Sequence, residues 1–460
     1  MNELKHNRVV SFLFVTLPVL FSLISPAIAE QPLLKKYIME FNLDAVEKNL
    51  TDDSYRGEEG VLAVTPEEAK SLGMKAVIDE DYLEAMRLFK EADECLGKAK
   101  LAMSTNVKEK SPGYYAGEIS GNFLKFKKGS GEAKIRLASY HSRLNADNDD
   151  RLNEVACGVI IDKVLDQCLN NKEYGLRDKL ALFYNTCHGI NIKNYPLTDK
   201  NVRFVNYVFN GFLKEAAQEE KNKYDLDLAG DYESIGSYNW KDAAGFGASE
   251  YAGLLEAALK KLGDSIYPVD PLLFMALMKR ESGFDSKAVS SVGAAGLTQI
   301  MPQTAKDIGM INIFMPEYYQ EAVSLIKKER DAKNSALSTL YEINEENGLQ
   351  FAEKARKLMQ ESLELGREKT KLFEKYENEL VKNHNDDRLH SALSIEYGLK
   401  YFSGLMKRYN GDISLALASY NAGEFRVKDF NGIPPYKETV GFRNKILQFY
   451  REYLDKIIVK

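Results

Sequence analysis

Glu281 is the residue of this sequence whose position best suits acid chemistry. Asp270 and Pro271 favour a helix start, because aspartate caps a helix N-terminus and proline fits its first position. The apolar residues that follow predict a helix that ends near Gly283, which places Glu281 in the last turn. The helix dipole and apolar neighbours would both disfavour a charged carboxylate there, so we expect a raised pKa. A protonated carboxyl group near neutral pH can protonate a glycosidic oxygen, although a solvated helix-end glutamate explains the position alone equally well.

Four short motifs in a fixed order accompany this acid. They resemble the motifs of the family 1 lytic transglycosylases, whose core is shared with goose-type lysozyme. The resemblance covers about residues 250–455 apart from an insertion, and it does not reach residues 30–230. The motifs are, in order, Glu281 to Asp285, Ser290 with Gly293 to Ala305, Ala418 to Gly423, and Ile433 to Thr439.

The resemblance implies roles for seven residues of these motifs. Glu281 matches the family's catalytic acid. The other six match residues of the substrate cleft: the polar Ser290 and Gln299 with the apolar Met301 beside them, Tyr420 and Asn421 facing the acid, and Glu438 on the peptide-bearing side. Thr298 stands where the family usually has methionine, which puts the local wall of the cleft in doubt.

The resemblance implies an enzyme that cleaves peptidoglycan glycan strands with one carboxylate. Glu281 would protonate the oxygen that links N-acetylmuramic acid to N-acetylglucosamine. The C6 hydroxyl of the muramic acid would then attack C1, and ionised Glu281 would accept its proton, leaving a 1,6-anhydro end. No second carboxylate of the kind that glycosidases place ~5 Å or ~6.5–9.5 Å away stands out in the motifs. Asp285 suits a turn better than this role.

Two other functions remain open at the level of sequence. The protein could be a lysozyme-like hydrolase that uses water, or a non-catalytic peptidoglycan-binding scaffold of an envelope machine. We expect no cofactor and no metal, since the five histidines are scattered and show no metal-binding spacing.

The formal net charge of −6 makes nucleic acid an improbable partner. Peptidoglycan is itself acidic, so an acidic enzyme needs local positive groups. Several basic residues flank the motifs and could supply them, although an ordinary surface charge is the favoured interpretation of each. These are Lys279, Arg280, Arg426, Lys428, Lys437 and Arg443.

Helical spacing of apolar residues continues through most of the chain and predicts an all-α protein. We expect a helical N-terminal region at residues 30–227, a linker at 228–249 and a lysozyme-like catalytic domain at 250–460. Ala69 to Ala99 is similar to one tetratricopeptide-type helix pair. Trp240 in the linker suits a packing anchor, with sugar stacking as the alternative.

Residues 312–388 are highly charged and carry a narrow apolar seam with heptad-like spacing. This pattern predicts a helical hairpin inserted into the catalytic domain. The hairpin could be a purely structural element, a lid over the cleft or a docking arm for a protein partner. The N-terminal helical region is a second candidate for docking a cell-envelope protein.

The first 29 residues are typical of a cleavable signal peptide. A weakly basic start precedes an apolar stretch, and Ala27-Ile28-Ala29 forms a small-x-small cleavage site. An uncleaved anchor is the alternative, but the stretch is short for a membrane span. We therefore expect a periplasmic protein, with association to the envelope left open.

Four cysteines fit such a compartment. Cys157 and Cys168 would lie too far apart on one helix to pair, since a helix rises ~1.5 Å per residue. If the chain turns back after residue 170, Cys187 comes level with Cys157. We therefore favour a Cys157–Cys187 disulfide, with buried free thiols as an equal alternative.

Overall fold

The computed structural model describes residues 31–41, 56–105, 111–192, 195–216, 240–243, 249–383 and 385–458. These residues are arranged in helices, and the only β-structure among them consists of isolated bridges. The prediction of an all-α protein is confirmed. None of the described helices is long and apolar enough to span a membrane.

An N-terminal lobe is built from a helix at residues 31–41, α2 (Pro66–Ser71), α5 (Glu154–Leu169), α6 (Leu176–Cys187) and α7 (Val202–Glu215). Its core is formed by the apolar sides of these helices. Helix α7 contributes the buried aromatic side chains of Phe204, Phe209 and Phe212 to this core.

A C-terminal lobe surrounds α11 (Pro271–Ser282), whose residues 272–278 are all buried. A helix that is apolar on all sides must lie in the centre of its domain. The helices around it are α9 (Trp240–Ala243), α10 (Ser249–Leu262), α12 (Pro302–Asp307), α15 (Ser391–Arg408), α16 (Ile413–Ala422), α17 (Glu424–Asp429) and α18 (Lys437–Ile458).

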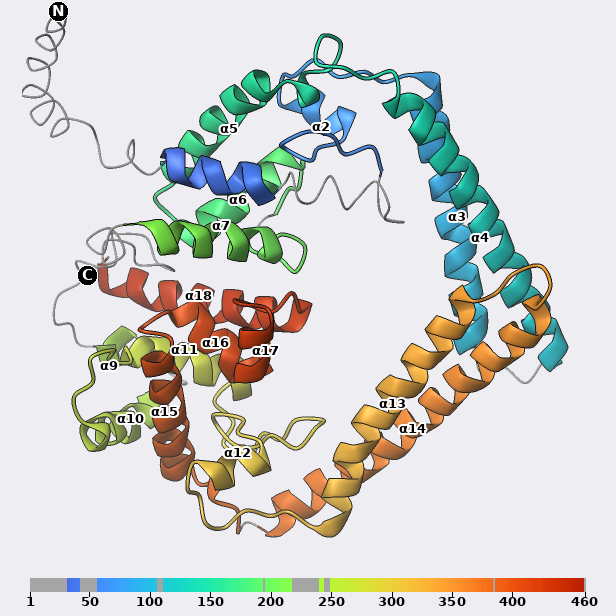
Figure 1. The fold of residues 1–460 in the computed structure, drawn as a ribbon. Helices are drawn as coiled ribbons and strands as arrows, with labels where there is room; N and C mark the ends of the chain where they lie inside the picture. Colours follow the sequence, from blue (N-terminus) through green and yellow to red (C-terminus); the bar gives the residue numbers. More distant parts are fainter. Residues whose placement is uncertain are drawn as a thin grey trace, which may run out of the picture.

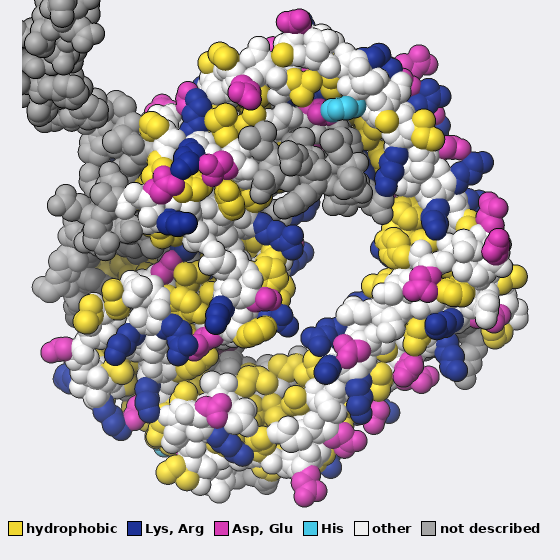
Figure 2. Space-filling view, viewed as in Figure 1, with side chains coloured by type: hydrophobic (Ala, Val, Ile, Leu, Met, Phe, Trp, Pro, Cys, Tyr) yellow, Lys and Arg dark blue, Asp and Glu magenta, His cyan; other side chains and the backbone are white. Residues whose placement is uncertain are grey.

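Each lobe extends a long helical hairpin. The first consists of α3 (Glu80–Ser104) and α4 (Pro112–His141), and the second of α13 (Glu317–Tyr341) and α14 (Gly348–Asn383). The hairpins meet at their far ends, and the lobes meet at α7 and α16–α18, so the chain forms a ring (Figure 1). The space-filling view shows that this ring encloses a central opening (Figure 2).

Side chains of α14 join the two hairpins. The side chain of Gln360 donates to the carbonyl of Met103 over 2.9 Å, and Arg356 donates to that of Thr105 over 2.9 Å. Since α3 pairs along its length with α4, the expected tetratricopeptide-type pair within residues 69–99 is not formed, and that interpretation is wrong. The charged segment at 312–388 does contain a helical hairpin, α13 and α14.

The predicted Cys157–Cys187 disulfide is wrong, because all four cysteines are free. The Cys157 thiol lies 3.3 Å from the carbonyl oxygen of Arg151, at the start of α5. Cys187 lies instead close to Cys168, at the other end of α5, where the neighbouring thiol adds to the effect of burial and raises its pKa. The alternative of buried thiols holds for Cys157, Cys168 and Cys187.

The predicted signal peptide lies outside the described residues, as does most of the predicted linker. Trp240, in α9, packs on the core of the C-terminal lobe. This contact agrees with its interpretation as a packing anchor.

Candidate functional site

Glu281 lies in the last turn of α11, as predicted. The Asp270 side chain accepts from the backbone N–H groups of Leu272 and Leu273, Pro271 occupies the first turn, and Gly283 ends the helix in the left-handed conformation at φ 61°. A left-handed residue directly after a helix is the usual position of glycine. The local sequence therefore fixes where the chain leaves the helix, and with it the position of the carboxyl group.

The carboxyl group of Glu281 is kept in its protonated form by its surroundings. Burial raises its pKa to about 8, and the nearby charge of Glu438 adds to this, while Arg280 acts in the opposite direction. No hydrogen bond or ion pair of the Glu281 side chain is found within the described part of the chain, so no cation holds it ionised. The group can therefore carry a proton at neutral pH.

Tyr420 and Asn421 lie next to each other near the end of α16, and Tyr420 is close to this acid. The Tyr420 hydroxyl donates to the carbonyl oxygen of Thr298 over 2.7 Å. Burial, followed by the proximity of Glu281, raises the Tyr420 pKa well above its ordinary value, so the phenol stays neutral. The side-chain oxygen of Asn421 accepts from the Thr439 hydroxyl over 2.8 Å. The structure thus brings together α11, α16 and the start of α18, which carries the exposed Glu438.

Ser290 and Gln299 organise the loop between α11 and α12. The Ser290 hydroxyl accepts from the backbone N–H of Ala294 over 2.9 Å. The Gln299 amide nitrogen donates to the carbonyls of Ala288 and Gly296, both at 2.9 Å, and Gln299 itself is left-handed at φ 46°. Much of the polar capacity of these two side chains therefore serves the loop. Their predicted contact with substrate stays a prediction.

Met301 and Thr298 follow in the same loop. Met301 is half-buried at the N-cap position of α12. The Thr298 side chain is fully buried and its hydroxyl donates to the carbonyl of Ser394 over 3.0 Å. A Cβ atom at Gly398 would lie only 2.6 Å from the Thr298 methyl group. Thr298 is therefore part of the packing against α15, and only its carbonyl faces Tyr420.

Two other groups of predicted residues can now be placed. Asp285 is exposed and accepts from the backbone N–H of Lys287 over 2.8 Å, as expected for a turn residue. Arg443 is neither a surface charge nor a substrate contact, because it is fully buried and paired with Asp178 of the other lobe at 2.7 Å. Arg280, Lys428 and Lys437 remain exposed.

Sequence reasoning missed a buried clamp behind the loop. The Arg388 guanidinium is paired with Asp386 at 2.8 Å and donates to the carbonyls of Gly293 and Ile300 over 2.9 Å and 3.2 Å. It also donates to the Tyr376 hydroxyl of α14 over 2.7 Å. The clamp fixes the loop and joins it to the hairpin. A signal was available, since Asn-Asp-Asp-Arg-Leu occurs twice in the sequence, at 148–152 and 385–389.

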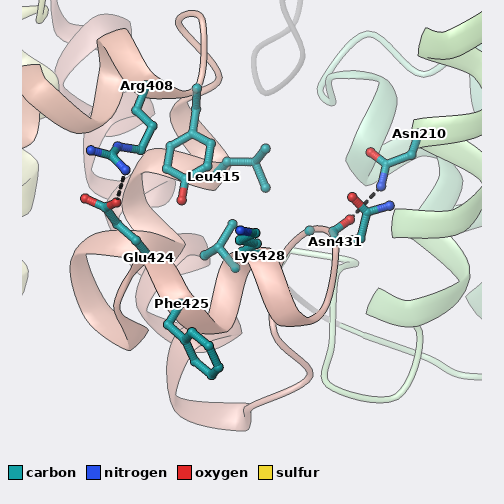
Figure 3. A pocket seen from close by; sticks show the side chains of 10 residues that line it. Asn210, Arg408, Leu415, Glu424, Phe425, Lys428 and Asn431 are labelled. Atoms are coloured by element: carbon teal, nitrogen blue, oxygen red, sulfur yellow. Dashed lines mark hydrogen bonds and ion pairs between the residues drawn. The ribbon is translucent and has the colours of Figure 1, made fainter.

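A separate pocket of about 510 Å³ lies where the lobes meet. Its lining comes from α15–α17 and from Asn210 of α7, whose side chain donates to the carbonyl of Asn431 over 2.6 Å (Figure 3). Arg408 and Glu424 form an ion pair at its edge. None of the seven predicted site residues lines this pocket, so it is distinct from the surroundings of Glu281.

Within the described residues, no group of three or more His, Cys, Asp or Glu side chains could hold a metal ion. The described fold and site define an all-α domain in which a carboxylic acid with a raised pKa lies at the end of the central helix. Residues 261–348 and 367–439 match the family described as Transglycosylase SLT domain. This match lies within the C-terminal lobe, and the predicted resemblance to the lytic transglycosylases is confirmed. The gap in the match, at 349–366, falls within α14.

Two known proteins are similar to parts of the chain. A transglycosylase of Enterobacteria phage PRD1 is 42% identical over 50 residues, which are 11% of this chain and 19% of the phage protein. The chain therefore matches about a fifth of that relative's length. The structure of an inactive mutant of the lytic transglycosylase Slt from Pseudomonas aeruginosa matches with 12% identity over 82% of this chain and 68% of that one. Its TM-score of 0.27 is too low to indicate a shared arrangement.

Proposed function

We propose that the C-terminal lobe cleaves the bond between N-acetylmuramic acid and N-acetylglucosamine in peptidoglycan, with Glu281 as its single acid and base. The proposal rests on the Glu281 carboxyl group, whose pKa burial raises to about 8 and which has no ion-pair partner within the described residues. The family match supports the same class of reaction.

The reaction begins with transfer of the Glu281 proton to the bridging oxygen. The bond between C1 and this oxygen breaks, and positive charge develops at C1 and the ring oxygen. The C6 hydroxyl of the same sugar then attacks C1 and gives its proton to the ionised Glu281. This step restores the acid and leaves a 1,6-anhydro end without consuming water. The neighbouring Tyr420 stays neutral throughout, because its pKa is far above the working range.

Glu438 and Asn421 are proposed to meet the substrate beside the acid, with Ser290, Gln299 and Met301 on the loop opposite. We further propose that the protein works in the periplasm, where peptidoglycan lies and to which the predicted signal peptide would export it. Its partner in this proposal is the glycan strand.

Product analysis of digested sacculi by mass spectrometry tests the proposal. The wild-type protein should release muropeptides that end in anhydro-N-acetylmuramic acid, each lighter by one water than the product of hydrolysis. Glu281→Gln should release almost none. Asp285→Asn is the matched control, because it removes a nearby carboxylate that serves only a turn. Reducing ends in place of anhydro ends would indicate a hydrolase, and an active Glu281→Gln variant would refute the role of this acid.

A further inference from the structure

Two stretches of the N-terminal lobe recur in the C-terminal lobe. Residues 57–74 align with residues 293–310 at a constant spacing of 236. The residues shared by the two stretches are Gly57, Gly60, Pro66, Ala69, Lys70, Gly73 and Met74, which recur as Gly293, Gly296, Pro302, Ala305, Lys306, Gly309 and Met310. The second stretch is the repeated Asn-Asp-Asp-Arg-Leu run, which follows the hairpin in each lobe.

The backbone of the first stretch repeats as closely as its sequence. Gly57, Gly60, Ala63 and Gly73 have φ of 87°, 67°, 49° and 83°, and the residues 236 positions later have 88°, 79°, 46° and 104°. A left-handed residue other than glycine is uncommon. Its occurrence at both Ala63 and Gln299 therefore indicates the same loop. The isolated bridges Glu59–Val64 and Ala295–Ile300 also correspond.

The buried arginine clamp is repeated atom by atom. Arg151 is paired with Asp149 at 2.8 Å and donates to the carbonyls of Gly57 and Val64 over 2.8 Å and 3.2 Å. It also donates to the Tyr140 hydroxyl over 2.5 Å. Every one of these partners has its counterpart around Arg388. Both arginines are fully buried.

The remaining elements correspond in the same order. Helices α2 to α6 match α12 to α16, and α7 matches α18. Asn185 on α6 accepts from Asn201 over 2.9 Å, as Asn421 on α16 accepts from Thr439. The helix of residues 31–41 matches α11, because both helices contain the sequence Pro-Leu-Leu near their start.

This alignment shows what the N-terminal lobe lacks. The Phe41 ring lies 5.4 Å from that of Phe204, and Arg280 lies 5.6 Å above the corresponding ring of Phe442. Phe41 therefore aligns with Arg280, and the next residue in the sequence, Asn42, aligns with Glu281. A neutral amide cannot act as a general acid.

The substrate-binding positions differ as well. Ala63 aligns with Gln299, and Lys200 aligns with Glu438, so one polar group is lost and one charge is reversed. We infer that residues 31–216 are a second copy of the transglycosylase fold, that this copy lacks an acid at the position aligned with Glu281, and that it serves as a positioning lobe for the site at Glu281. The positioning role rests on the proposed function, whereas the duplication does not.

The second copy holds the N-terminal end of α16. Arg177 on α6 forms two hydrogen bonds with Asp412, at 3.0 Å and 2.7 Å, and Asp412 in turn caps α16 at the backbone N–H of Leu415 over 2.9 Å. The side chains of Arg177 and Asp412 are only 2% and 7% exposed. Helix α16 carries Tyr420 and Asn421 at its other end, so its placement sets theirs.

A second buried contact ties α16 to α18. Asp178 on α6 accepts from the Arg443 guanidinium of α18 over 2.7 Å and 2.9 Å, and Arg443 donates to the Ser414 hydroxyl of α16 over 2.8 Å. The carboxylate of the N-terminal lobe thus orients the arginine that joins the two helices. These helices carry the residues proposed to surround Glu281.

The loop between α17 and α18 is held from the same side. The Asn206 amide of α7 donates to the carbonyl of Ile433 over 2.9 Å and accepts from its N–H over 3.2 Å. Ala418 and Val440 share one buried cluster with the core of the N-terminal lobe. These contacts between the lobes therefore bear on α16, α18 and the loop that precedes α18.

Steady-state kinetics of Asp178→Asn in the full-length protein, with soluble glycan strands as substrate, tests the positioning role. The variant keeps the shape of the side chain but leaves the Arg443 charge unpaired. Because errors of ~1 Å in the placement of catalytic groups cost up to ~100-fold in rate, we expect kcat to fall by about 10- to 100-fold, with KM within about twofold. Ser414→Ala, which removes only the link from Arg443 to α16, should lower kcat in the same direction by a smaller factor.

Asp149→Asn is the matched control, because it breaks an equally buried aspartate–arginine pair of the same lobe away from α16 and α18. It should lower the melting temperature comparably and leave kcat unchanged among folded molecules. Equal kcat losses in Asp149→Asn and Asp178→Asn, or a wild-type kcat in Asp178→Asn, would overturn the positioning role while wild-type cleavage upheld the proposed function. A wild-type protein that cleaves no glycan would instead reject the proposed function and, with it, the positioning role.

Discussion

The two lobes have the same framework but differ at the position of the acid. Both keep the glycine-rich loop, the buried arginine clamp and the long hairpin. In the sequence alignment of the two lobes, the position of Glu281 is occupied by Asn42 in the N-terminal lobe. The shared framework therefore does not need a glutamate at this position. The residues that build the loop are separable from the proposed catalytic acid, although they lie near it in the sequence.

The largest expected contrast is between Glu281 and its counterpart Asn42. Glu281→Gln should lower the rate of glycan cleavage by about 10²- to 10⁴-fold, which is the usual contribution of a general acid. Asn42→Ala should stay within about twofold of wild type. Initial rates on purified sacculi provide the measurement. A large loss at Asn42 would mean that both lobes take part in the chemistry.

The two arginine clamps should contribute equally to the free energy of unfolding. Arg388→Met and Arg151→Met each leave a buried aspartate without its cation, which costs about 3–5 kcal/mol. Denaturant unfolding monitored by circular dichroism gives the free energies. The exposed pair Lys70→Met and Lys306→Met serves as control, and each should change stability by less than about 0.5 kcal/mol. A large loss of stability in only one of the two arginine variants would show that the clamps are not equivalent.

Gly60 and Gly296, which occupy equivalent positions in the two loops, should be similarly intolerant of substitution by alanine. A Cβ atom at Gly60 would lie 1.7 Å from the carbonyl oxygen of Arg151, and one at Gly296 would lie 1.8 Å from that of Arg388. Both residues are left-handed, so alanine adds backbone strain, and we expect each substitution to cost about 2–3 kcal/mol in thermal unfolding.

Gly73 is the control for these alanine variants, because it is left-handed at φ 83° but has no neighbour within 4 Å of the added atom. Gly73→Ala should cost only about 1 kcal/mol. Equal costs at Gly60 and Gly73 would show that the close approach of the Arg151 carbonyl is unimportant.

The smallest expected effect is the pH dependence of activity and stability. Because Glu281 must be protonated and its pKa is raised to about 8, kcat/KM should be level below pH 8 and fall about tenfold per unit above it. Between the ordinary value of 4.5 and 8, the folded state binds a proton that the unfolded state releases. Wild-type stability should therefore decline relative to Glu281→Gln as pH rises through this window. A basic limb near pH 5 would refute the raised pKa.

The sequence was sufficient for the fold class and for the position of Glu281. Helix α11 follows from local rules, namely an aspartate cap, a proline in the first turn and a terminal glycine. The hairpin at α13 and α14 followed from its heptad-like seam. These features depend on residues a few positions apart, which is the range over which helix propensity and capping act.

The features that the sequence analysis missed depend on distant residues. The disulfide prediction failed because it required the relative placement of α5 and α6, which tertiary packing decides. Arg443 was counted as a surface charge because its partner Asp178 is 265 positions away. The repeat was visible in the repeated Asn-Asp-Asp-Arg-Leu run. The tetratricopeptide interpretation considered only the spacing of residues around α3, and it did not take this repeated run into account.

The hairpins carry a consequence for the history of the molecule. Both interrupt the lobe at the same point, between the glycine-rich loop and the arginine clamp, and α3 and α13 each have 25 residues. A hairpin shared by both halves is older than the duplication that we infer. In this inference the single-lobe ancestor already carried the hairpin, and two such lobes joined at their bodies and hairpin tips would have formed a homodimeric ring.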